Sequence, residues 1–107
     1  MRAEEFMSYL NQDEINRAAR DIGADIKIQP VDKVFRIDDK TDCIRIEITF
    51  LGVYKHANVI LSDDYIRKDT INDQMKRFIF SIMVNIFSDY LCSVLNISRM
   101  KEMKEDN

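Results

Sequence analysis

The chain has 107 residues, of which 46% are hydrophobic and 33% charged, and its formal net charge at pH 7 is −3. This length fits one domain with its own core, and this composition excludes a disordered chain. The acidic balance, with basic pairs interleaved among acids, disfavours nucleic-acid binding, which needs clustered lysine and arginine. We expect a single α+β domain over residues 1–107, with 98–107 as a frayed, charged tail.

Residues 2–22 have helical spacing, either as two helices or as one bent helix. Asn11, followed by Glu14 three residues later, resembles a capping box that would begin a second segment. An apolar face then follows the helical period, and Gly23 is a natural stop after the last turn.

From Asp25 the hydrophobic period changes from 3.6 to 2, which predicts strands. The first short strand holds Ile26 and Ile28, and the others are expected at Val34–Ile37, Cys43–Leu51 and about His56–Leu61. In the third strand one set of side chains is apolar and the other is polar; the apolar set is Ile44, Ile46, Ile48 and Phe50, and the polar set is Arg45, Glu47 and Thr49. This alternation favours an antiparallel meander of three or four strands with one covered face.

The stretch Thr70–Ile97 predicts one long C-terminal helix packed on that sheet face. A narrow polar stripe leaves an apolar arc of roughly 200°, about twice what a helix on a single surface needs. The helix, roughly 40 Å long, also outruns a strand of roughly 30 Å. Its surplus apolar side must therefore contact the N-terminal helix or a second copy of the chain. The residues expected in such a dimer seam are Ile79, Met83, Phe87, Tyr90 and Val94.

A membrane span over Phe78–Ser98 is the main alternative for this helix, because the length and the flanking basic residues fit. Asp89 and the regular polar stripe argue against it, since a charge within a span is costly. The N-terminus has no secretion signal, and the two cysteines lack disulfide or metal spacing. We therefore expect a cytoplasmic protein that does not bind a membrane.

No catalytic, metal or cofactor motif is evident in the sequence. His56 is the single histidine, Cys43 and Cys92 fit buried thiols, and the two glycines cannot form a phosphate-binding loop. Carboxylates crowd two turns, where turn and cap chemistry already accounts for them. An enzyme is therefore the least expected class.

The expected function is a non-enzymatic protein–protein interaction module. Three features motivate a narrower hypothesis: the small size, the acidic balance and an amino-acid usage typical of AT-rich genomes. The hypothesis is an anti-CRISPR or anti-restriction inhibitor from a phage or mobile element that binds a nucleic-acid enzyme. The alternatives are a homodimeric structural or accessory subunit, and a small-molecule-binding domain with its ligand between sheet and helix. Candidate partner-binding residues are Asp38, Asp39, Asp42, Arg45, Glu47, Thr49, Asp63 and Asp64.

Overall fold

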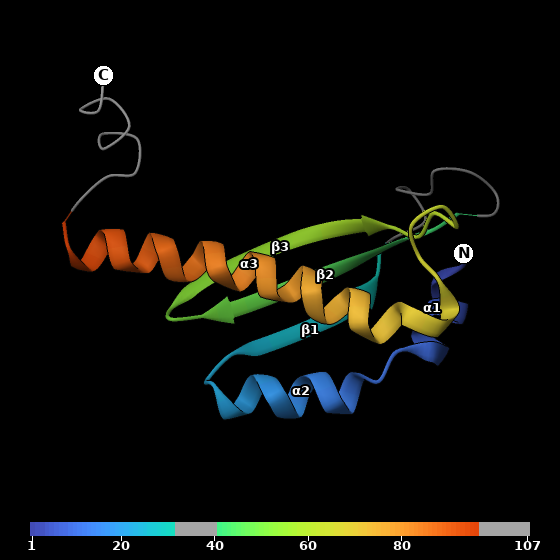
Figure 1. Ribbon diagram of the computed structural model, residues 1–107, viewed down its shortest axis with the longest axis horizontal. Helices are drawn as coiled ribbons and strands as arrows, with labels where there is room; N and C mark the ends of the chain where they lie inside the picture. Colours follow the sequence, from blue (N-terminus) through green and yellow to red (C-terminus); the bar gives the residue numbers. More distant parts are fainter. Residues whose placement is uncertain (32–40, 97–107) are drawn as a thin grey trace, which may run out of the picture.

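The computed structural model describes residues 1–31 and 41–96, and its order of elements is α, β, α (Figure 1). A three-stranded antiparallel sheet has the order β1-β2-β3, and the long C-terminal helix contacts the sheet. The predicted α+β arrangement is confirmed. The predicted strand Val34–Ile37, Ile97 and the tail 98–107 lie outside the described residues. The elements are α1 (Ala3–Tyr9), α2 (Gln12–Asp21), β1 (Asp25–Pro30), β2 (Cys43–Phe50), β3 (Val53–Ile60), the 3-10 helix η2 (Lys68–Thr70) and α3 (Ile71–Val94).

The register of the sheet separates an apolar face from a polar one. Ile46, in the central strand, lies opposite Ile28 on one side and Ala57 on the other. Because side chains alternate along a strand, the neighbouring isoleucines of β1 and β2 share this face with Ile46. They are buried, whereas the intervening side chains face away from the helices. The strand predicted at Cys43–Leu51 corresponds to β2, and its predicted division into a buried apolar side and a polar side is confirmed.

The turn between β2 and β3 is tighter than the sequence indicated. Phe50 pairs with Val53, so that Leu51 and Gly52 alone form the loop, with φ of 53° and 75°. Two positive φ values in a two-residue hairpin correspond to a type I′ turn, which matches the strand twist. The last strand, which is β3 in the structure, was predicted to begin near His56, and that start was wrong. Such a short turn lets pairing resume at once, and β3 therefore begins at Val53.

The N-terminal region forms two helices, as one of the two sequence alternatives proposed. The Asn11 Oδ1 atom accepts a hydrogen bond from the Glu14 backbone N–H at 3.2 Å, which caps the start of α2. At its other end Gly23 has a φ of 75°, and the Ala24 N–H donates to the Ala19 carbonyl oxygen at 2.8 Å. This pattern is a Schellman motif, and it turns the chain directly into β1.

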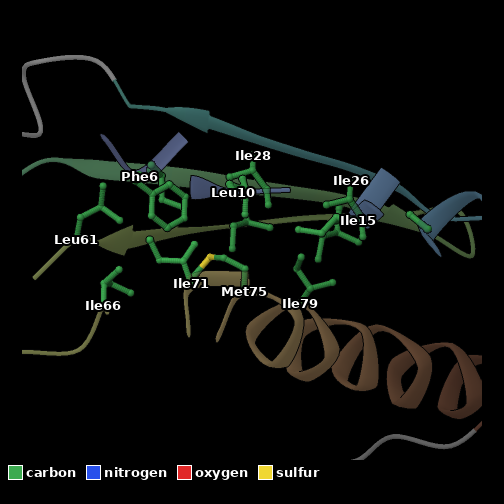
Figure 2. Packing of buried hydrophobic residues seen from close by; sticks show 14 of the residues in the cluster. Phe6, Leu10, Ile15, Ile26, Ile28, Leu61, Ile66, Ile71, Met75 and Ile79 are labelled. Atoms are coloured by element: carbon green, nitrogen blue, oxygen red, sulfur yellow. The ribbon is translucent and has the colours of Figure 1, made fainter. Parts of the chain in front are cut away.

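One continuous core lies between the sheet and the helices (Figure 2). From α3, the side chains of Ile71, Met75, Ile79 and Ile86 are buried in it. These positions recur every three to four residues or a multiple of that spacing, so they occupy one side of the helix. Phe6 of α1 reaches the same core and is fully buried. The sheet therefore covers only one side of α3.

The last turns of α3 extend past the sheet, beyond the β2–β3 turn (Figure 1). An ion pair between the Lys55 Nζ and Asp89 Oδ2 atoms, 3.0 Å apart, connects β3 to the helix near this edge. Between Asp89 and Asn96 none of the side chains is buried. A helix of 24 residues is about 36 Å long, whereas an eight-residue strand spans about 26 Å. The sheet is too short to cover α3 along its whole length.

Replacing Ile46 by alanine should lower the free energy of unfolding by about 2 to 5 kcal/mol, because a fully buried side chain leaves a cavity in the central strand. Urea denaturation followed by circular dichroism measures this. Ile60→Ala is the matched control; that side chain is 46% exposed, so the loss should be less than half as large. Equal losses would contradict the assignment of the core.

Replacing Leu51 by asparagine should raise the free energy of unfolding by about 1 kcal/mol, because asparagine tolerates the left-handed conformation better than leucine. Gly52→Ala should lower it by a similar amount. A Cβ at Gly52 would meet no atom within 4 Å, so that loss would come from the backbone alone. The same denaturation measurement applies, and a destabilised Leu51→Asn protein would argue against the type I′ turn.

Candidate binding surfaces

The residues that most often perform chemistry are dispersed in this fold. His56 is exposed on β3, and its ring centroid lies 5.8 Å from that of Tyr54. Cys43 is buried, and both burial and the nearby Asp42 carboxylate raise the pKa of its thiol, which disfavours the reactive thiolate. Cys92 is half-buried on α3. Among residues 1–31 and 41–96, no group of three His, Cys, Asp or Glu side chains is placed to hold a metal ion.

The face of the sheet turned away from the helices is the first candidate surface, which we call the open face. It contains all three sheet residues proposed from sequence, Arg45, Glu47 and Thr49. The neighbouring strands add further polar and aromatic side chains, namely Lys27, Gln29, Tyr54, His56 and Asn58.

Hydrogen bonds across the strands hold several of these side chains in place. The Tyr54 hydroxyl donates to Glu47 Oε1 at 2.8 Å, and this bond raises the pKa of the hydroxyl. The Arg45 Nε–H donates to Asn58 Oδ1 at 3.2 Å. The open face is thus a partly ordered polar surface that carries a tyrosine and an arginine, two residue types enriched at protein interfaces.

Two of the proposed acidic residues, Asp42 and Asp63, contact the N-terminal segment and not the open face. The Asp42 carboxylate accepts a hydrogen bond from the Ala3 N–H at 2.9 Å and lies 3.6 Å from an Arg2 guanidinium nitrogen. Asp63 lies 3.3 Å from the N-terminal ammonium group. These two carboxylates therefore hold the N-terminal segment. Asp64 is exposed, and Asp38 and Asp39 lie outside the described residues.

The outward side of α3 is the second candidate surface. We call five of its side chains the outer stripe; they are Phe80, Val84, Phe87, Leu91 and Val94. Each is at least 40% exposed, and Phe80 reaches 69%. Exposed large apolar residues also occur beside the stripe, at Tyr90 and Leu95.

The outer stripe lies opposite the buried side of the helix. Its positions alternate by four and three residues, so they follow one line along α3, on the side facing away from the sheet. Fully burying a large apolar side chain gains about 1.5–3 kcal/mol. Five partly exposed ones together thus forgo an amount comparable with the total stability of a domain, about 5–15 kcal/mol. Such a patch on a small soluble protein typically marks an interface.

The sequence located this surface only in part. Of the seam residues it proposed, Phe87, Tyr90 and Val94 are exposed, Met83 is half-buried and Ile79 is buried in the core. Ile79 therefore lies in the monomer core, where it faces the sheet. Phe80, Val84 and Leu91 were missed, although their four-and-three spacing is visible in the sequence. The signal was obscured because α3 is apolar over most of its circumference and the covered side was unknown.

Two apolar grooves border α3. One, of about 370 Å³, lies between α2 and α3 and is lined mainly by Ile15, Ala18, Ile22, Ile79, Phe80 and Met83. The Lys76–Glu14 ion pair, with its Nζ and Oε1 atoms 2.6 Å apart, lies beside it. The other, of about 570 Å³, lies between the end of β3 and the first half of α3, and Phe78 is part of its wall. Both grooves open to solvent.

By length and composition the segment Lys68–Val94 could cross a membrane. The core helix of a soluble protein can pass the same test, but such a helix is mostly buried, whereas only 11% of the most apolar stretch of this segment is buried. Its position in this fold argues against a span. Ile71, Met75, Ile79 and Ile86 pack on a sheet whose other face is polar. Asp89, inside the segment, pairs with Lys55 of β3. Removing α3 from the sheet would expose the whole core, and the compact fold suggests a soluble protein.

Comparisons of the chain with protein-family models, with curated proteins and with solved structures find no match. The surfaces of the molecule are therefore the basis for inferring its function. Among the described residues, the outer stripe and the open face are the two surfaces whose side chains are suited to binding another protein.

Proposed function

We propose that this protein is a non-enzymatic protein–protein interaction module of the cytoplasm, and that the outer stripe of α3 is its principal binding surface. The observation that carries the proposal is the exposure of this apolar line on a helix whose opposite side is already buried in the core. The location is supported by Cys43 and Cys92, which are both in the thiol form.

The chemistry of the outer stripe fits a protein partner. Phenylalanine, leucine and valine offer shape and apolar area, and they carry no charge to bind a phosphate backbone. An exposed helix face with anchors four and three residues apart is suited to packing against another helix. The net charge of −3 also opposes attraction to nucleic acid or to an anionic membrane surface.

The open face supports a second candidate function, the binding of a different protein. Tyr54 is 55% exposed beside Arg45 and Glu47, and the cross-strand hydrogen bonds hold these groups in place before binding. The inhibitor hypothesis, in which the partner is a nucleic-acid enzyme, would use this surface. Its support is the small, acidic chain and the polar, arginine-bearing sheet.

Replacing Phe87 by glutamate should abolish capture of the protein that covers the outer stripe, because a charge would lie at the centre of an apolar interface. The measurement is affinity capture of the tagged chain from cells of its source, followed by mass spectrometry with quantification of every co-isolated protein. If the captured protein is an untagged copy of this same chain, that copy is counted as the bound partner. We expect one protein in near-stoichiometric amount with the unaltered chain and a loss of at least ~30-fold with Phe87→Glu.

Phe78→Glu is the control for this experiment. Phe78 carries the same side chain on the same helix and is 38% exposed, but it faces the β3 side, 180° around α3 from Phe87. Capture should survive this change. If the unaltered chain retains no protein in a manner that depends on Phe87, the proposed function is wrong.

Replacing Arg45 and Tyr54 together by alanine tests the open face separately. If a second protein binds there, its capture should fall by about 10-fold or more, while capture through the outer stripe stays unchanged. Arg17→Ala, at an exposed position on α2 outside the open face, is the matched control and should have little effect. Unchanged capture of every partner by the double variant would exclude the open face as a binding surface.

A further inference from the structure

We infer that the outer stripe binds the outer stripe of a second copy of this chain, with the two α3 helices antiparallel and a two-fold axis passing near Phe87. This inference rests on the proposed function, because it names the partner of that surface. It is carried by the position of the stripe, its spacing, the order of large and small residues along it and the groove at one end.

The spacing of the outer stripe suits pairing with an identical helix. From Phe80 to Val94 the alternation of four and three residues repeats the heptad pattern by which two helices interlock. Because the stripe faces away from the sheet, two copies could approach until their helices touch, with each sheet on the far side of its own helix. A two-fold contact uses one patch on both chains, so one exposed stripe is sufficient to form it.

The order of side-chain sizes favours the antiparallel arrangement. Phe80 and Val94 lie seven residues on either side of Phe87, and Val84 and Tyr90 lie three on either side. An antiparallel pair centred on Phe87 therefore brings the two Phe87 side chains together at the axis and places Phe80, at each end, opposite Val94 of the second copy. Large residues opposite small ones fill an interface without voids or overlap.

The charge that continues the stripe disfavours a parallel pair. Asp73 lies seven residues before Phe80, on the same side of α3. Its side chain is 66% exposed, and its Oδ2 atom lies 3.4 Å from the Arg77 Nε atom of the same helix. A parallel pair in register would bring Asp73 against Asp73 and Phe80 against Phe80. The antiparallel pair avoids the repulsion between carboxylates, and it also opposes the two helix dipoles.

The groove between α2 and α3 gives the end of the second helix a place to dock. It lies beside Phe80, at the end of the stripe that an antiparallel partner reaches with Val94. Val94 is 61% exposed, and Ile22, on the α2 wall of the groove, is 56% exposed. The apolar end of α3 that projects past its own sheet would thus be covered by the groove of the other copy.

Sedimentation equilibrium from about 1 to about 200 μM tests the inference directly. We expect the unaltered chain to be a dimer over the upper part of this range. Phe87→Glu should weaken the dimer by at least ~100-fold, because the substitution places two like charges beside the axis. Phe78→Glu and Asn85→Glu, both on other sides of α3, should leave it intact. Circular dichroism checks that each variant is folded. If Phe87→Glu does not fold, Val84→Arg replaces it as the variant that disrupts the interface.

Cross-linking distinguishes the two orientations. In a Cys92→Ser background, Phe80→Cys and Val94→Cys chains are treated with a short bismaleimide, each alone and as a mixture. In the antiparallel pair only the mixture should cross-link efficiently, since the two copies of position 80 lie about 21 Å apart along the helices. Efficient cross-linking of each variant alone would indicate a parallel pair and overturn the antiparallel arrangement.

Three other outcomes would overturn the inference. They are an unaltered chain that stays monomeric up to about 200 μM, a dimer that persists in folded Phe87→Glu, and a monomer that sediments with anionic phospholipid vesicles in a Phe87-dependent manner. The first outcome leaves the proposed function in place if the capture experiment finds a different protein on the outer stripe. If the chain is monomeric and no protein is captured through the outer stripe, the proposed function is wrong as well.

Discussion

The packing of one side of α3 against the isoleucines of β2 is the contact on which the rest of the molecule depends. Ile44, Ile46 and Ile48 are fully buried, and the helix covers them with Ile71, Met75, Ile79 and Ile86. Burial of this apolar surface supplies most of the driving force for the fold. Because a single sheet can cover only one side of a helix, the same contact also determines which part of α3 remains exposed.

The small size of the other elements makes that exposure unavoidable. In α2 the core-facing residues Ile15 and Ala19 pack beside β1, and a groove separates this helix from Phe80 and Met83. The α1 helix has seven residues and contacts only the first part of α3. A second copy of α3 is long enough to cover the whole stripe, and it carries the matching apolar line.

Such a dimer would have a simple architecture with consequences for binding. The two α3 helices would form a central layer, with one sheet on each side and the open faces turned outward. Arg45, Glu47 and Tyr54 would then be presented twice, on opposite sides of the assembly. Two identical sites on one particle can bind a multivalent partner more tightly than either site alone, provided that both can be reached at once.

The sequence by itself determined which of the described segments are helical and which are extended, and which face of β2 is apolar, because local periodicity is set by backbone geometry. The cap at Asn11, the stop at Gly23, the division of β2 and the 200° apolar arc of α3 all follow from residues close together in the chain. Only the tertiary structure decided which part of that arc is buried. Ile79 and Phe80 are adjacent and equally apolar, yet one lies in the core and the other is exposed. That difference depends on where the sheet crosses the helix, and this position is set by contacts between residues far apart in sequence.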